Sequence, residues 1–157
     1  MATIAPELTE SPITTTSRHR RVISALWLFV LLCYLYCDVL GFYYAPDLVD
    51  ILEGRVTGIE LTQGFLLGSA VLMTIPIGMT LVSRIASRPI ARWSTVVAGT
   101  VMTLAQVASL FVGNATMHYV YFSVIEIATT AFLALYAGLR WRAAAPRGSE
   151  VAAQGAG

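Results

Sequence analysis

Five strongly polar side chains interrupt segments that are otherwise apolar: Asp38, Glu60, Gln63, Gln106 and Glu126. Carboxylates and amides of this kind bind protons, cations and small ligands that form hydrogen bonds. Inside a hydrocarbon layer an acidic side chain costs about 2.5–3.5 kcal/mol on insertion scales, so it faces another polar group or water. These five residues are therefore our candidates for binding a ligand or a proton. The alternative is that they only hold helices together through hydrogen bonds.

The sequence contains no pattern typical of an enzyme or a metal centre. His19 and His118 are too far apart to form a metal-binding pair. Cys33 and Cys37 are four residues apart, which is not a C-x-x-C redox motif. A disulfide at that spacing on a regular helix is strained, so we interpret them as two small buried hydrophobic residues. We predict no catalytic residue, no metal site and no cofactor.

The composition indicates a protein surrounded by lipid. Of the 157 residues, 57% are hydrophobic and 12% are charged, about half the charged share of a soluble domain. A soluble protein of this size cannot cover such a core, so the lipid bilayer is the first predicted partner. The net charge of +1 gives no reason to expect nucleic acid. Every basic residue is Arg, and with the many Ala and Gly this indicates a bacterial source.

Four apolar segments are long enough to cross a hydrocarbon core of about 30 Å. They cover approximately residues 22–44, 58–83, 93–112 and 119–141, within a membrane domain of residues 22–142. We predict that residues 1–21 are a disordered tail with a basic flank and that residues 143–157 form a second disordered tail. Residues 45–57 are either a short helix on the membrane surface, beginning near Pro46, or a plain loop.

The arginines fix the predicted orientation. Nine of the ten lie in the N-terminal flank, the loop between the second and third segments, and the C-terminal flank, whereas Arg55 alone lies in another loop. The positive-inside rule then places both termini in the cytoplasm. The predicted fold is an all-α, integral membrane four-helix bundle with several passes through the bacterial plasma membrane.

This topology places the polar side chains at one level. Asp38, Gln63, Gln106 and Glu126 all fall in the outer half of the bilayer, and Glu126 has no basic residue in its own segment. We expect the four to share a polar layer in the bundle interior.

The second segment carries residues that affect helix packing. Glu60, Gly64 and Gly68 follow one another at intervals of four, and small residues at this spacing allow a neighbouring helix to approach closely. Pro76 predicts a kink, with a gating hinge as a further interpretation.

Four stretches together resemble an uncharacterised bacterial family of small four-span membrane proteins, one of the domain-of-unknown-function families. They are residues 35–40 (LYCDVL), 58–66 (GIELTQGFL), 75–77 (IPI) and 125–127 (IEI). More loosely, the layout is similar to DoxX-like four-helix membrane proteins, some of which associate with quinone or thiol oxidation systems. The resemblance covers about residues 22–141, supports the four-span topology and implies no activity.

The sequence leaves three functions open. The preferred one is a membrane protein that binds or passes a small ligand, ion or proton through an outward-facing polar pocket. The second is a structural or accessory subunit of a membrane complex or homo-oligomer. The third is a quinone-linked membrane redox protein.

Overall fold

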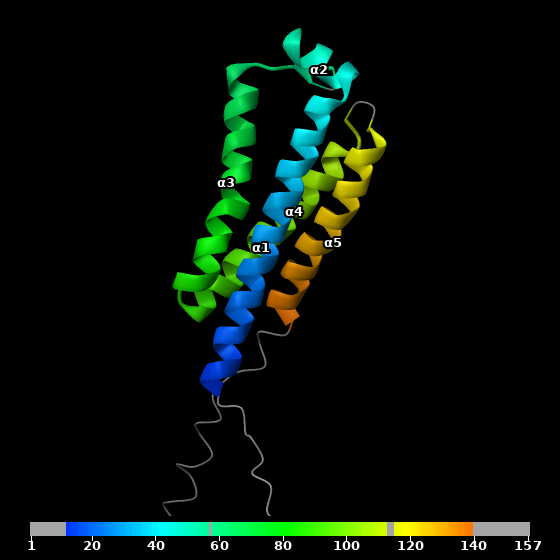
Figure 1. The fold of residues 1–157 in the computed structure, drawn as a ribbon. Helices are drawn as coiled ribbons and strands as arrows, with labels where there is room; N and C mark the ends of the chain where they lie inside the picture. Colours follow the sequence, from blue (N-terminus) through cyan, green and yellow to red (C-terminus); the bar gives the residue numbers. More distant parts are fainter. Residues whose placement is uncertain (1–11, 57, 113–114, 140–157) are drawn as a thin grey trace, which may run out of the picture.

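A computed structural model describes residues 12–56, 58–112 and 115–139 of the chain (Figure 1). The described residues form five helices, and three of them are long and apolar enough to cross a membrane, namely α1, α3 and α5. The predicted all-α class is therefore confirmed. The helices are α1 (Pro12–Tyr43), α2 (Ala45–Leu52), α3 (Gln63–Ile85), α4 (Arg88–Ser109) and α5 (Met117–Leu139).

The four long helices lie side by side in a closed order. Helix α1 packs against α3 and α5, α3 also packs against α4, and α4 packs most extensively against α5. The connection between α3 and α4 lies at the same end as the start of α1 and the end of α5 (Figure 1). We call this the arginine end, because Arg18, Arg20, Arg21, Arg84, Arg88 and Arg92 all belong to it. The opposite end is called the outer end.

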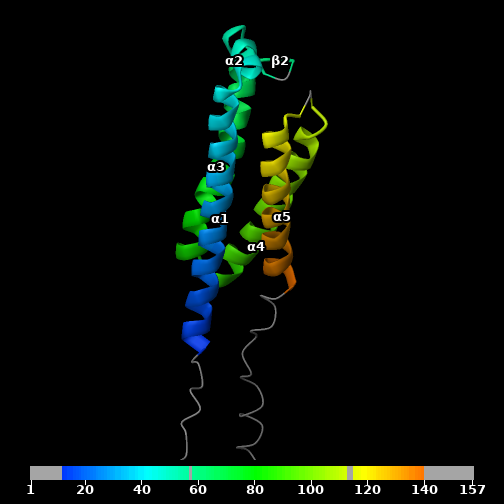
Figure 2. The same cartoon turned by 45° about the vertical axis from the view of Figure 1, so that its right-hand side comes forward.

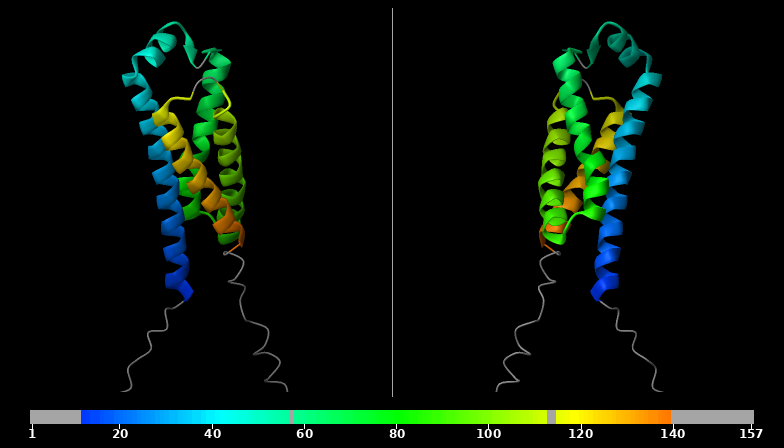
Figure 3. Two further views of the ribbon diagram at one scale, coloured as in Figure 1. Left: turned by 90° about the vertical axis from the view of Figure 1, so that its right-hand side faces the viewer. Right: turned by 90° about the vertical axis from the view of Figure 1, so that its left-hand side faces the viewer.

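The outer end carries the connection between α1 and α3. Helix α2 is followed by a hairpin of two short antiparallel strands, β1 (Arg55–Val56) and β2 (Ile59–Glu60). This connection arches beyond the ends of α4 and α5 (Figures 2 and 3). Of the two interpretations of residues 45–57, the structure therefore supports a short helix. No residue of α2 is buried.

Three helix starts differ from the sequence prediction, and one of them is that of α4, which begins at Arg88 and not at residue 93. Helix α1 begins at Pro12, so residues 12–21 belong to a helix and not to the predicted tail. Helix α3 begins at Gln63 and not at Gly58, because Gly58 has a positive φ of 82° and Thr62 caps the helix. The Thr62 hydroxyl accepts a hydrogen bond from the backbone N–H of Phe65 at 3.1 Å, which satisfies one of the otherwise unpaired N–H groups of the first turn. The predicted tail of residues 143–157 lies outside the described residues.

The hydrophobic core lies between mid-bundle and the arginine end. It is built around Trp27, Val30, Met102 and Leu133, none of which is more than 1% exposed. Burial of large apolar side chains from α1, α4 and α5 brings these helices together. Helix α3 contributes Met79.

Arginine side chains cap the C-terminal ends of α3 and α5. Arg20 donates hydrogen bonds to the backbone oxygens of Arg84 and Ala86 at 3.1 and 2.8 Å, where α3 ends. Arg92 donates to the oxygens of Ala137 and Gly138, both at 3.0 Å, in the last turn of α5. The final carbonyls of a helix have no partner within the helix and carry its negative dipole end, so a guanidinium group stabilises both features.

The outer half of α3 differs from the rest of the bundle. Residues 62–71 are all exposed, whereas Pro76, Met79 and Ser83 further along the helix are buried. An added Cβ at Gly68 would meet no atom of the described chain within 4 Å, and one at Gly64 would meet only the hydroxyl of Thr62 at 3.9 Å. The close contact predicted for Gly64 and Gly68 is therefore not made with another helix of this chain.

The close approach occurs instead at Gly99 on α4. A Cβ placed there would lie 2.9 Å from the backbone oxygen of Thr130 and 3.1 Å from the Cβ of Ala134. Because the first of these is a backbone atom of α5, it cannot move aside without shifting the helix. Gly99 thus sets the distance between α4 and α5.

We expect Gly99→Ala to lower the free energy of unfolding in detergent by about 1–3 kcal/mol, since the added methyl group forces α4 and α5 apart. Gly68→Ala is the matched control, because its methyl group meets open space and alanine favours a helix by about 0.8–1 kcal/mol over glycine. Thermal unfolding of both variants checks this. Equal loss of stability in the two would mean that Gly99 does not control the α4–α5 distance.

Candidate functional site

Helices α4 and α5 are joined by a series of side-chain hydrogen bonds along their outer halves. The Gln106 amide donates to the Ser123 hydroxyl at 2.8 Å, and both residues are buried. The series consists of Tyr119 with Ser109 at 2.7 Å, Gln106 with Ser123, and Thr103 with Thr130 at 2.8 Å. We call it the α4–α5 polar ladder. Each bond across a helix interface in a membrane contributes about 0.6–2 kcal/mol.

Glu126 lies on the same buried stripe of α5 as two members of the ladder. Ser123 precedes it by three residues and Thr130 follows it by four, so the three side chains share one helical face. Both neighbours bond to α4, but Glu126 does not. Its side chain is 1% exposed, and neither carboxylate oxygen has a hydrogen-bond partner among the described residues. A buried carboxyl without a partner is energetically costly, so it requires an explanation.

The side of α1 that adjoins Glu126 carries two thiols and a phenol. Cys33, Tyr34 and Cys37 are all buried on α1, which packs against α5, the helix that carries Glu126. Both cysteines are free, in agreement with their interpretation as buried thiols. The Tyr34 hydroxyl is a second buried group for which the described chain provides no hydrogen-bond partner. Glu126 and Tyr34 therefore bring two unpaired polar groups to one interface.

Asp38 lies next to Cys37 on α1, on the outer side of this interface. Its side chain is exposed, and it is near enough to Glu126 for the two carboxyls to interact electrostatically. Asp38 is therefore the acidic group between Glu126 and the outer end.

The five candidates from the sequence are only partly brought together. Gln106 is buried at the α4–α5 interface, Glu126 is buried on α5, and Asp38 is near enough to Glu126 for an electrostatic interaction. Glu60 is exposed on β2, in the hairpin, so it does not lie on α3 as the sequence suggested. Gln63 is the first residue of α3 and lies in the exposed outer part of that helix.

Two residues of the site were not among the candidates. Tyr34 is four residues before Asp38, and Ser123 is three residues before Glu126, so helical spacing from each acidic residue identifies both. Their side chains are common on apolar helices, and spacing alone does not distinguish a paired hydroxyl from an unpaired one.

The arrangement can accept a group that donates hydrogen bonds. An ionised carboxyl is an acceptor only, with two oxygens, and a tyrosine hydroxyl can accept as well as donate. The described residues contain no group of three or more His, Cys, Asp or Glu side chains that could hold a metal ion. The site therefore offers a single buried acid on α5 and a buried phenol on α1, the helix packed against it.

Comparison with known protein families gives one match. A family model described as a family of unknown function (DUF6326) matches residues 13–146. The chain belongs to this family. The match covers every described helix except the first residue of α1, and it agrees with the resemblance to an uncharacterised family. No curated protein and no solved structure matches the chain, and the likeness to DoxX-like proteins stays a prediction.

We expect Glu126→Leu to raise the free energy of unfolding by about 1–3 kcal/mol. The change removes a buried polar group that has no partner and replaces it with an apolar side chain of similar size. Glu126→Gln keeps polar atoms in the same place, so its stability should remain close to that of the original chain. Thermal unfolding in detergent measures both.

The matched control is Gln106→Leu, one helix away in the same layer. This change breaks the bond to Ser123 and should lower stability by about 0.6–2 kcal/mol. If Glu126→Leu destabilises the protein as much as Gln106→Leu does, Glu126 serves to hold the helices together and is not a binding group.

Proposed function

We propose that the protein spans a bacterial plasma membrane four times, with both termini in the cytoplasm, and binds a small cation or a hydrated proton at Glu126 from the outer side. The observation that carries this proposal is the Glu126 carboxyl, which is 1% exposed and unpaired within the described chain. An ionisable side chain buried inside a membrane span is costly, so we take it as the functional group of this site.

Helix α4 is the fourth proposed span. Its 22 residues extend for about 33 Å, which is enough to cross the hydrocarbon core. It is more polar than α1, α3 and α5, but the side chains of Thr103, Gln106 and Ser109 bond within the bundle. A lipid-exposed surface of apolar residues remains, including Val97 and Leu104.

The distribution of charge supports the orientation. Every described arginine except Arg55 belongs to the arginine end, and every described Asp and Glu lies in the outer half of the bundle or in the outer connection. Arg55 forms an ion pair with Glu53 beside β1. The positive-inside rule places the arginine end in the cytoplasm, so Asp38 and Glu126 belong to the half that faces outward.

The proposed route to Glu126 is one-sided. Asp38 lies between Glu126 and the outer surface, and its charge attracts cations toward the buried acid. On the cytoplasmic side the interior is filled by Trp27, Val30, Met102 and Leu133. A packed core on the cytoplasmic side of Glu126 favours binding over passage across the membrane.

The ligand is proposed from the groups that would hold it. Two carboxylate oxygens and one phenol oxygen suit a small donor of hydrogen bonds, and the nearby Asp38 adds a second negative charge. A hydrated proton or a small cation fits these requirements, whereas an anion would be repelled by both carboxyls. That the protein has no cofactor and is not an enzyme remains a prediction.

One observation favours the second function, that of an accessory subunit. The nine residues 63–71 of α3 are exposed, including Gly64 and Gly68, so this part of a proposed membrane helix leaves its surface for lipid or another protein. Nothing in the described residues favours the quinone-linked alternative.

The proposal predicts that cationic reagents reach the site faster than anionic ones. In a Cys33→Ala variant, which leaves Cys37 as the only cysteine, a small cationic methanethiosulfonate added to right-side-out membrane vesicles should react at least tenfold faster than its anionic sulfonate counterpart. The two carboxylates concentrate the cation and repel the anion. Asp38→Asn and Glu126→Gln, added singly, should each reduce this ratio.

A single cysteine at Ala115, in a chain without Cys33 and Cys37, is the control. It shows that both reagents reach the outer side, and it gives the ratio of their reaction rates at a thiol away from the two acidic residues. A cysteine at Ser149 should react only after permeabilisation. Reaction of Cys37 only in inverted vesicles would contradict the orientation, and equal normalised rates for the two reagents would contradict cation selectivity.

A further inference from the structure

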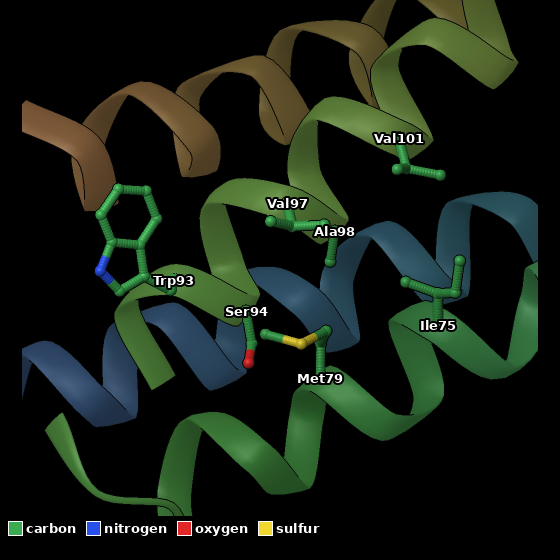
Figure 4. A pocket seen from close by; sticks show the side chains of 7 residues that line it. All are labelled: Ile75, Met79, Trp93, Ser94, Val97, Ala98 and Val101. Carbon is green, nitrogen blue, oxygen red and sulfur yellow. The ribbon is translucent and has the colours of Figure 1, made fainter. Parts of the chain in front are cut away.

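A groove of about 480 Å³ runs between α3 and α4, away from the Glu126 site (Figure 4). Its walls include Ile75 and Met79 from α3 and Val97 and Val101 from α4. This volume lies within the range of about 300–1,000 Å³ that is typical of sites for small molecules. The groove is open along one side, and Val97 on its rim is 59% exposed. It therefore faces the surroundings of the bundle.

The sequence explains why the groove forms at this place. Helix α4 presents the small side chains of Ser94 and Ala98 toward α3, so the two helices leave space between them (Figure 4). The contact between α3 and α4 is also the sparsest among the neighbouring long helices. Except for the Ser94 hydroxyl, the side chains around the groove are apolar or aromatic.

One end of the groove is close to concentrated positive charge. Trp93 and Ser94 lie in the second turn of α4, whose first residue is the exposed Arg88. Arg84, in the last turn of α3, is also exposed, and its Nε donates a hydrogen bond to the Ser24 hydroxyl of α1 at 3.0 Å. The Arg92 guanidinium lies 5.4 Å from the centre of the Trp93 ring. No described Asp or Glu lies at this end of the bundle, so its positive charge is not neutralised by acidic side chains of the described chain.

We propose that the α3–α4 groove binds an anionic phospholipid of the cytoplasmic leaflet, with an acyl chain in the groove and the headgroup phosphate at Arg84 and Arg88. An apolar groove inside the hydrocarbon region suits an acyl chain. Arginines near its cytoplasmic end attract a negative headgroup. Trp93 lies at the level of the headgroups, where tryptophan is enriched.

This inference rests on the proposed membrane orientation but not on ligand binding at Glu126. The groove is built by α3 and α4, whereas Glu126 faces α1 from α5. The two proposals therefore fail separately.

The test is thermal unfolding of the full-length protein in detergent, with added phosphatidylglycerol or phosphatidylcholine of the same acyl chains. Phosphatidylglycerol should raise the unfolding temperature at a concentration at least tenfold lower than phosphatidylcholine. The double change Arg84→Gln with Arg88→Gln should remove this difference. Arg18→Gln with Arg21→Gln, which removes the same charge from α1, should retain it, and Glu126→Gln should also retain it.

A second pair of variants tests the groove itself. Val97→Trp fills the groove from its exposed rim and should abolish the effect of phosphatidylglycerol. Val107→Trp makes the same change on the outer half of α4 and should leave it intact. Equal responses to the two lipids, or a full phosphatidylglycerol response in Val97→Trp, would overturn the proposal. Loss of the response in both arginine pairs would reveal general attraction to the arginine end and would also overturn it.

Discussion

The close contact between α4 and α5 is the constraint on which the rest of the structure depends. At Gly99 the absence of a side chain lets the backbone of α5 come so near that a Cβ would lie 2.9 Å from the Thr130 oxygen. The polar ladder continues the contact toward the outer end, and Arg92 secures it at the opposite end through the last carbonyls of α5. Together these contacts fix the rotation of α5, and with it the direction in which Glu126 points.

That rotation explains why Glu126 is unpaired. The side chains before and after it on the same face, Ser123 and Thr130, are bonded to Gln106 and Thr103 of α4. Glu126 lies between them without a bond to α4, and α1, which packs against α5, brings the buried Cys33, Tyr34 and Cys37 but no basic or amide side chain to this half of the bundle. A bundle that satisfies the polar groups on both sides of a carboxyl, but not the carboxyl itself, keeps that group available for a ligand.

The sequence predicted the all-helical class, the burial of Gln106 and Glu126, and a short helix as one of two options for residues 45–57. It did not predict that α3 begins only at Gln63. The apolar pattern continues through residues 58–62, so it does not reveal the turn at Gly58 or the cap at Thr62. It also assigned close helix packing to Gly64 and Gly68, whereas Gly99 makes that contact. Spacing identifies a stripe of small residues but not the helix that faces it. In the same way, the predicted topology placed Glu126 and Gln106 at one level but could not show that Gln106 pairs with Ser123.

The central claim is that Glu126 is held inside the bundle for a partner that the chain itself does not supply. An experimental structure of the protein in lipid, at a resolution that shows ordered water and ions, tests this most directly. The account predicts non-protein density within hydrogen-bonding distance of a Glu126 carboxylate oxygen, and of the Tyr34 hydroxyl as well. A Glu126 side chain that points into lipid, or whose two oxygens bond only to groups of this chain, would contradict it.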